Sequence, residues 1–247
     1  MGGDWTNGGQ CVEIEEMREF DFLVLGSGIA GLFFALKAAP LGRVAIITKK
    51  DRAESNTNYA QGGIAAVTSK EDSVELHVRD TLEAGAGLCK EAVVRVIVQE
   101  GPARIAELMR YGMQFTEREI PSSHGARELD LGREGGHSKR RILHAKDVTG
   151  REVERALLAA VAAESNITIF ENHIAIDLIT SRKLGLGGEN RCLGAYVLDK
   201  QSGNVRPLPP PPRSWPPAAA ARFISIPPTP ILPPATAWPW PIGLGRK

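Results

Sequence analysis

The chain has 247 residues, of which 43% are hydrophobic and 24% charged, with a formal net charge of +1, values typical of a globular protein of one or two domains. No apolar run reaches the roughly 18 residues that a membrane span needs, and residues 1–20 lack a basic start followed by an apolar core. We therefore expect neither a membrane protein nor an exported one. Three cysteines far apart in the sequence indicate neither a disulfide framework nor a CxxC metal site, and favour a reducing cytoplasm.

The composition changes abruptly near residue 208. Of the 17 prolines, 14 lie in residues 207–247, a stretch with four basic residues and no Asp or Glu. Subtracting those four from 30 Lys and Arg leaves 26 against 29 acidic residues, a net charge of −3 for residues 1–206. A mildly acidic body does not predict a nucleic-acid partner. We divide the chain into an N-terminal tail (1–19), a domain (20–208) and a Pro-rich tail (209–247).

Within the domain, the spacing of apolar residues predicts alternating strands and helices. Short apolar or β-branched runs predict strands at 20–26, 44–48, 167–170, 175–180, 192–198 and 205–208. Helical spacing predicts helices at 29–39, 73–84, 90–111 and 149–164, with the third interrupted at Gly101-Pro102. Gln201-Ser202-Gly203 predicts a hairpin between the last two strands. The expected fold is α/β, Rossmann-like, with a β excursion.

A GxGxxG pattern lies between the first predicted strand and helix, at Gly26-Ser27-Gly28-Ile29-Ala30-Gly31. The first glycine permits the tight turn, the second lets a pyrophosphate approach the backbone, and the third lets the helix pack close to the strand. The helix N-terminus then offers N–H groups to the phosphates. Thr48-Lys49-Lys50 stands where an acidic residue would meet the ribose, so NAD, NADP and FAD all remain open on the fingerprint alone.

A small, polar loop with two glycines follows at residues 55–67 (SNTNYAQGGIAAV). Its backbone supplies many N–H groups and little bulk, which suits a flat ring bearing carbonyl oxygens. An ordinary surface loop has the same composition, so the loop by itself leaves both interpretations open.

These residues resemble the flavoprotein family of succinate dehydrogenase, fumarate reductase and L-aspartate oxidase. The resemblance covers about residues 20–206, and within the family it is strongest to the L-aspartate oxidases. It is carried by GSGIAGL at 26–32, the lysine that ends the second strand, and three longer blocks: NTNYAQGGIAAV at 56–67, HVRDTLEAGAGLC at 77–89 and REGGHSKRRILHAKDVTGREVE at 133–154.

The resemblance implies FAD as the cofactor. Gly26 to Gly31 would cradle the pyrophosphate, Lys49 would lie near the adenosine half, and Ile174 and Ala175 would contact adenine through the backbone. The isoalloxazine side would be wrapped by Asn56, Thr57, Asn58, Tyr59, Ala60, Gln61, Gly62 and Gly63. The family's membrane dehydrogenases attach FAD through a histidine at the position of Asn56. An amide cannot form that bond, so non-covalent FAD is expected.

The resemblance also implies a reaction, the oxidation of L-aspartate to iminoaspartate in the first step of NAD biosynthesis, with oxygen or fumarate as electron acceptor and quinolinate synthase as a candidate partner. Glu134 would face the substrate, where a carboxylate suits an α-ammonium group; a solvated glutamate beside a Gly-Gly turn is the alternative. The family's main catalytic Arg and His residues have no counterpart in this chain. Two other functions remain open: a non-catalytic flavin- or nucleotide-binding module, and a fumarate reductase or succinate dehydrogenase flavoprotein.

The Pro-rich tail departs from the family, which continues with a strand and a Val-Leu-Ala-Thr-Gly-Gly turn. Synonymous codons can be chosen for residues 214–247 so that the same DNA, translated one base earlier, encodes a different sequence. That sequence begins VLATGG and contains the family's NPD…GDG motif. We interpret residues 209–247 as an out-of-frame, disordered tail, and the domain as incomplete at its C-terminal end. Its prolines should keep the tail from replacing the missing strand. A polyproline linker or SH3-type ligand is the compositional alternative.

Overall fold

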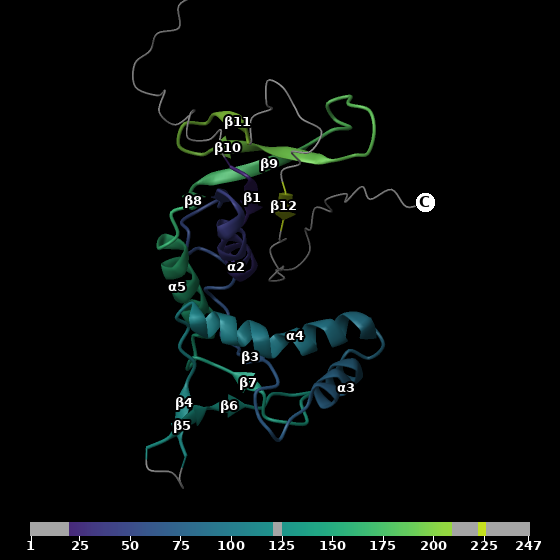
Figure 1. Ribbon diagram of the computed structural model, residues 1–247, viewed down its shortest axis with the longest axis vertical. Coiled ribbons are helices and arrows are strands. Elements are labelled where there is room, and N and C mark those ends of the chain that lie inside the picture. Colours follow the sequence, from purple (N-terminus) through teal and green to yellow (C-terminus); the bar gives the residue numbers. More distant parts are fainter. Residues whose placement is uncertain (1–19, 121–124, 209–221, 226–247) are drawn as a thin grey trace, which may run out of the picture.

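A computed structural model describes residues 20–120, 125–208 and 222–225 (Figure 1). Its central sheet is parallel and four-stranded, in the order β12-β1-β2-β8. The strands are β1 (Phe22–Leu25), β2 (Val44–Ile47), β8 (Ile167–Phe170) and β12 (Arg222–Ser225). β1 and β2 are buried almost throughout, as their unbroken apolar runs predicted.

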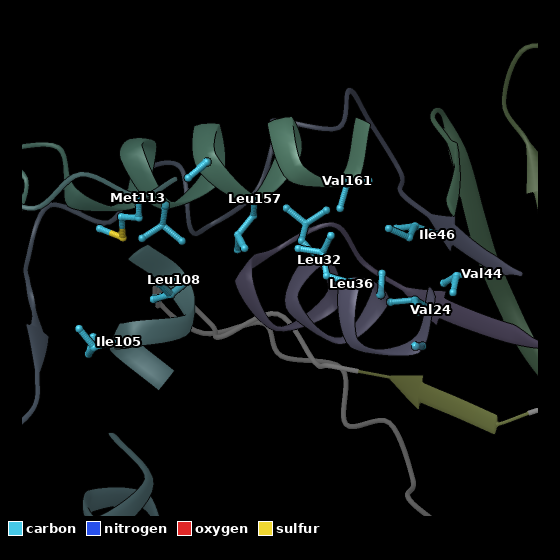
Figure 2. Packing of buried hydrophobic residues seen from close by; sticks show 14 of the residues in the cluster. Val24, Leu32, Leu36, Val44, Ile46, Ile105, Leu108, Met113, Leu157 and Val161 are labelled. Carbon is cyan, nitrogen blue, oxygen red and sulfur yellow. The ribbon is translucent and has the colours of Figure 1, made fainter. Parts of the chain in front are cut away.

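Two helices pack together beside this sheet. Helix α2 (Ile29–Ala38) connects β1 to β2 through the short 3₁₀ helix η1 (Ala39–Leu41), and α5 (Thr149–Ala162) precedes β8. In Figure 2, Leu32 and Leu36 of α2 lie between Leu157 of α5 and Val24 of β1. This packing fixes the start of α2 against the carboxyl end of β1.

Helices α3 (Val74–Ala84) and α4 (Glu91–Arg110) lie against each other below the sheet (Figure 1). The predicted interruption at Gly101-Pro102 is wrong, because α4 is continuous with Pro102 inside it. Proline removes one helical hydrogen bond, and burial of Val98 and Ile105 on either side offsets that cost. No helix in the described ranges is both long and apolar enough to cross a membrane.

Three smaller sheets complete the described structure. The β excursion is an antiparallel sheet of β9 (His173–Thr180), β10 (Cys192–Asp199) and β11 (Val205–Leu208), and the hairpin predicted at 201–203 joins β10 to β11. A second sheet, which the sequence did not predict, has the order β3-β7-β6, with β3 (Ile64–Ala65), β6 (Leu131–Gly132) and β7 (Ile142–Leu143). β4 (Glu117–Glu119) and β5 (Arg127–Leu129) form a two-stranded ribbon.

Strand β12 corrects one expectation about the tail. Arg222–Ser225 pairs in parallel with β1, with Phe22 opposite Arg222, so a piece of the tail does occupy the edge of the central sheet. These four residues contain no proline, and their backbone can therefore donate to the ladder. The remainder of the Pro-rich tail and the tail at 1–19 lie outside the described residues.

Candidate functional site

The GxGxxG residues form the turn between β1 and α2. Gly26 has φ +110°, a conformation that favours glycine, and Gly28 is the N-cap of α2 without a side-chain cap. A Cβ on Gly31 would meet the carbonyl oxygen of Gly26 at 2.1 Å, whereas a Cβ on Gly28 would meet only Thr57 Oγ1, at 3.4 Å. Gly31 therefore allows close packing, and Gly28 leaves space beside the helix N-terminus. Ile29 and Ala30, in the first turn, are exposed.

Two threonines tie this turn to neighbouring segments. The amide of Ile29 donates to Thr57 Oγ1 at 3.0 Å, which brings the polar loop to the helix N-terminus. Ser27 is buried, and its hydroxyl donates to Thr48 Oγ1 at the end of β2, also at 3.0 Å. The structure thus brings together two predicted groups, the glycine turn and the loop. Sequence reasoning assigned no role to Thr48.

The residues expected near adenosine also meet, at the carboxyl end of β2. The amide of His173 donates to the Thr48 carbonyl at 3.0 Å, and the Lys200 ammonium donates to the Lys49 carbonyl at 3.2 Å. Ile174 and Ala175 follow on β9, where Ala175 packs against the apolar cluster that includes Ala45 and Ile47 of β2. Carboxyl ends of parallel strands are where open α/β sheets bind ligands.

Hydrogen bonds from the first turns of α5 hold the polar loop in place. The amide of Gly150 donates to the Ala60 carbonyl at 2.9 Å, and a Cβ on Gly150 would meet the Thr57 carbonyl oxygen at 1.8 Å. One turn further along, Glu154 Oε2 accepts from the Ser55 hydroxyl at 3.0 Å. Within the loop Asn58 is half-buried, while the exposed residues are Asn56, Tyr59, Ala60, Gln61 and Gly62.

Glu154 is the most perturbed carboxyl near the loop. It is 1% exposed, and its Oε1 has no hydrogen-bond partner among the described residues. Burial raises the pKa of Glu154 to about 7, against a smaller lowering by the Ser55 hydrogen bond. The apolar pattern of α5 hid this residue, since Glu154 lies between the core positions Val153 and Leu157.

The structure places Glu134 and Gly63, the last residue proposed to line the flavin, at opposite ends of the small β3-β7-β6 sheet. Gly63 directly precedes Ile64 of β3, which pairs with Leu143 of β7. Glu134 comes two residues after Gly132 of β6, which pairs with Ile142 of β7. Because β3 and β6 both run antiparallel to β7, Gly63 and Glu134 stand at opposite ends of this sheet. Glu134 is exposed, and its carbonyl accepts from the amide of His137 at 3.3 Å.

A buried ion cluster holds the loop that carries Glu134. Arg141 is fully buried and forms ion pairs with two carboxylates. Its Nη2 lies 2.8 Å from Asp72 Oδ1, and its Nη1 lies 2.8 Å from Asp80 Oδ2. Ser138 donates to Asp80 from its amide at 2.8 Å and from its hydroxyl at 2.7 Å. Burial would raise the pKa of Asp80, but the bonds from Ser138 and Arg141 outweigh it and lower the pKa to about 2.

This arrangement fits the pyrophosphate of a dinucleotide. The first turn of α2 presents N–H groups that have no partner inside the helix, and the missing side chain at Gly28 leaves the backbone approachable. Among the described residues no group of three His, Cys, Asp or Glu side chains is arranged to hold a metal ion. The glycine turn and the N-terminus of α2 can bind a phosphate-bearing organic cofactor.

Comparison with known proteins gives a consistent picture. Residues 21–208 match the protein family described as FAD binding domain. The chain is 52% identical over 188 residues to the chloroplastic L-aspartate oxidase of Arabidopsis thaliana, covering 76% of this chain and 28% of that protein. It is 50% identical over 189 residues to L-aspartate oxidase 1 of Ralstonia nicotianae, covering 76% of this chain and 34% of that protein.

Among solved structures, the quinol fumarate reductase of E. coli superposes with a TM-score of 0.66 at 27% identity, covering 76% of this chain and 30% of that one. The chain thus spans about a third of the length of the curated relatives that it matches.

Proposed function

The chain belongs to the FAD binding domain family, and from that membership we propose that it is the FAD-binding portion of an L-aspartate oxidase. The observation that carries this proposal is that about half of the aligned residues are identical to those of relatives named L-aspartate oxidase. The runner-up, a fumarate reductase or succinate dehydrogenase flavoprotein, is supported by solved structures at the lower identities of 26–28%.

FAD is the cofactor of this family, and each part of the candidate site has a role toward it. Gly26 to Gly31 bind the pyrophosphate at the start of α2, Lys49 with Ile174 and Ala175 line the adenosine half, and residues 56–63 line the isoalloxazine side. In a Rossmann-like unit these segments all follow the carboxyl ends of parallel strands. FAD, when bound, supplies the hydride acceptor, so the chain's own residues need only bind, orient and exclude water.

The flavin is held without a covalent bond in this proposal. Asn56 is exposed at the start of the loop, and its amide offers no nucleophile for attachment. Thr57, next to it, is engaged at the N-terminus of α2.

The proposed substrate is L-aspartate, which is oxidised to iminoaspartate with oxygen or fumarate as the electron acceptor. Glu134, on the loop held by Arg141, accepts a charge-assisted hydrogen bond from the substrate ammonium group. Quinolinate synthase, which uses the product, is the proposed partner. Cys89 and Cys192 are free thiols, which fits a reducing compartment such as the cytoplasm, although the plant relatives are named chloroplastic.

The Pro-rich composition after residue 208 fits a shifted reading frame. We use the name frame-restored protein for the product in which residues from 214 onward are read one base earlier and continue to the length of the relatives. The family's strand and glycine turn then follow β11, in place of the tail.

The test is the reduction of bound flavin by substrate. Frame-restored protein loaded with FAD should lose its yellow colour when L-aspartate is added without oxygen, and regain it with fumarate. Succinate and D-aspartate serve as controls that should not bleach the flavin. Bleaching by succinate with no response to L-aspartate would favour the runner-up function instead.

A further inference from the structure

The turn at residues 55–60 is pinned between the N-terminal halves of α2 and α5. Thr57 Oγ1 accepts from the Ile29 amide of α2, the Ala60 carbonyl accepts from the Gly150 amide of α5, and the Ser55 hydroxyl donates to Glu154. Ser55 also accepts from the amide of Asn58, with 3.2 Å to the carbonyl oxygen and 3.4 Å to Oγ. Ser55 therefore both shapes the turn and ties it to α5.

Glu154 is the buried end of this chain of hydrogen bonds. It is fully enclosed, yet one of its oxygens accepts a hydrogen bond from the Ser55 hydroxyl and the other has no partner among the described residues. A carboxylate at a purely structural position would be expected to have a cation or several donors.

Two ion pairs on the neighbouring helices do not involve Glu154. On α5 Glu152 pairs with Arg155, and Lys37 of α2 pairs with Glu107 of α4. Burial and the Ser55 hydrogen bond are the two influences on the pKa of Glu154, and no charge contributes. Nothing in the described surroundings of Glu154 compensates a negative charge there.

We propose that Glu154 is a positioning residue of the flavin site, which in its neutral form holds Ser55 and so keeps Thr57 and the following loop in place to receive the isoalloxazine side of FAD. The proposal rests on the proposed function only in taking FAD as the ligand. When Glu154 ionises, the buried charge is relieved by letting water into the turn, and this loosens Ser55 and the contact of Thr57 with α2.

The direction of the pH effect follows from the linkage of protonation to folding. Burial raises the folded-state pKa of Glu154 from 4.5 to about 7. The stability that the neutral side chain contributes is therefore fully present below pH 4.5 and is lost as the pH rises through about 7. Affinity for FAD should follow the same course, strong at mildly acid pH and weaker at alkaline pH.

The experiment measures the dissociation constant of FAD by flavin fluorescence between pH 6 and pH 9, in the frame-restored protein and three variants. The unsubstituted protein should bind FAD about tenfold more weakly at the alkaline end. If FAD binding raises the pKa of Glu154 by one unit, the affinity falls about tenfold as Glu154 ionises. Glu154→Gln, an isostere of the neutral acid, should bind FAD tightly with a flat profile. Glu154→Leu, which leaves Ser55 without its acceptor, should bind weakly throughout.

Glu164→Gln, at an exposed position just after α5, is the matched control and should keep the profile of the unsubstituted protein. Circular dichroism of each apoprotein identifies a variant that fails to fold. If Glu154→Leu fails to fold, Glu154→Gln still tests the inference. An unchanged pH profile in Glu154→Gln would overturn the positioning role while leaving FAD binding intact. Absence of FAD binding by the unsubstituted protein at every pH would instead overturn the proposed function, and this inference with it.

Discussion

Gly28 and Gly31 lie three residues apart in one turn, and the structure separates their roles. A Cβ on Gly31 would lie 2.1 Å from the carbonyl oxygen of Gly26, which is backbone and cannot rotate away. A Cβ on Gly28 would lie 3.4 Å from Thr57 Oγ1, an ordinary contact. Gly31→Ala should therefore cost folding stability, while Gly28→Ala should leave the fold intact and obstruct the approach of the pyrophosphate.

The magnitude for Gly31→Ala follows from the overlap. Relief of a 2.1 Å contact requires α2 to move away from β1 by about 1 Å, and forced overpacking of a buried site costs about 1–3 kcal/mol. In the frame-restored protein, urea denaturation should show that loss for Gly31→Ala and less than about 0.5 kcal/mol for Gly28→Ala, the range for substitutions without a specific mechanism. FAD titration should show the opposite order, with at least about tenfold weaker binding for Gly28→Ala at unchanged stability. Equal stability of the two variants, or undiminished FAD affinity in Gly28→Ala, would refute this division of roles.

Four further outcomes are expected of the frame-restored protein. Denaturation should release all of the flavin into the supernatant, because Asn56 cannot form a covalent link; yellow precipitate would contradict this. Glu134→Gln should lose L-aspartate oxidation about tenfold more than fumarate reduction, since a charge-assisted contact is worth about 1.5–3 kcal/mol, and equal losses in the two steady-state rates would show a structural role. Arg141→Met should lower the free energy of unfolding by about 3–5 kcal/mol by leaving buried carboxylates unpaired, whereas Arg118→Met, at an exposed ion pair, should change it by about 0–1 kcal/mol. Since the pKa of Asp80 is lowered from 3.8 to about 2, its stabilising contribution should be present above pH 3.8 and lost as the pH falls through about 2. The effect should be visible in acid denaturation and smaller in Arg141→Met, which keeps the Ser138 hydrogen bonds to Asp80.

Local patterns predicted most of the central unit. The unbroken apolar runs at β1 and β2, the glycine turn and the spacing of α5 each encode their own structure within a few residues, and all three stand where the sequence indicated. The prediction of a break at Pro102 was wrong because a helix with buried apolar residues on both sides of a proline tolerates the lost hydrogen bond. The strands β3, β6 and β7 have two residues each, too short for any periodicity to show.

The supporting parts of the candidate site lay beyond sequence reasoning because they depend on contacts between distant segments. Ser27 meets Thr48 across 21 residues, and Ser55 meets Glu154 across 99. Sequence reasoning assigned no role to Glu154, and only its burial against the turn reveals an unusual carboxyl. In the sequence, Gly150 is one residue of the block at 133–154 that resembles the family. In the structure, a Cβ at this position would collide with the Thr57 carbonyl oxygen, so no side chain fits there.

The most direct test of the account is hydrogen peroxide release from L-aspartate in air, with excess FAD. The frame-restored protein should turn over, whereas the 247-residue chain, which spans about a third of the length of its relatives, should bind FAD weakly and release no peroxide. Peroxide release by the 247-residue chain would contradict the proposed frame shift. Failure of the frame-restored protein to oxidise L-aspartate while loaded with FAD would contradict the central claim.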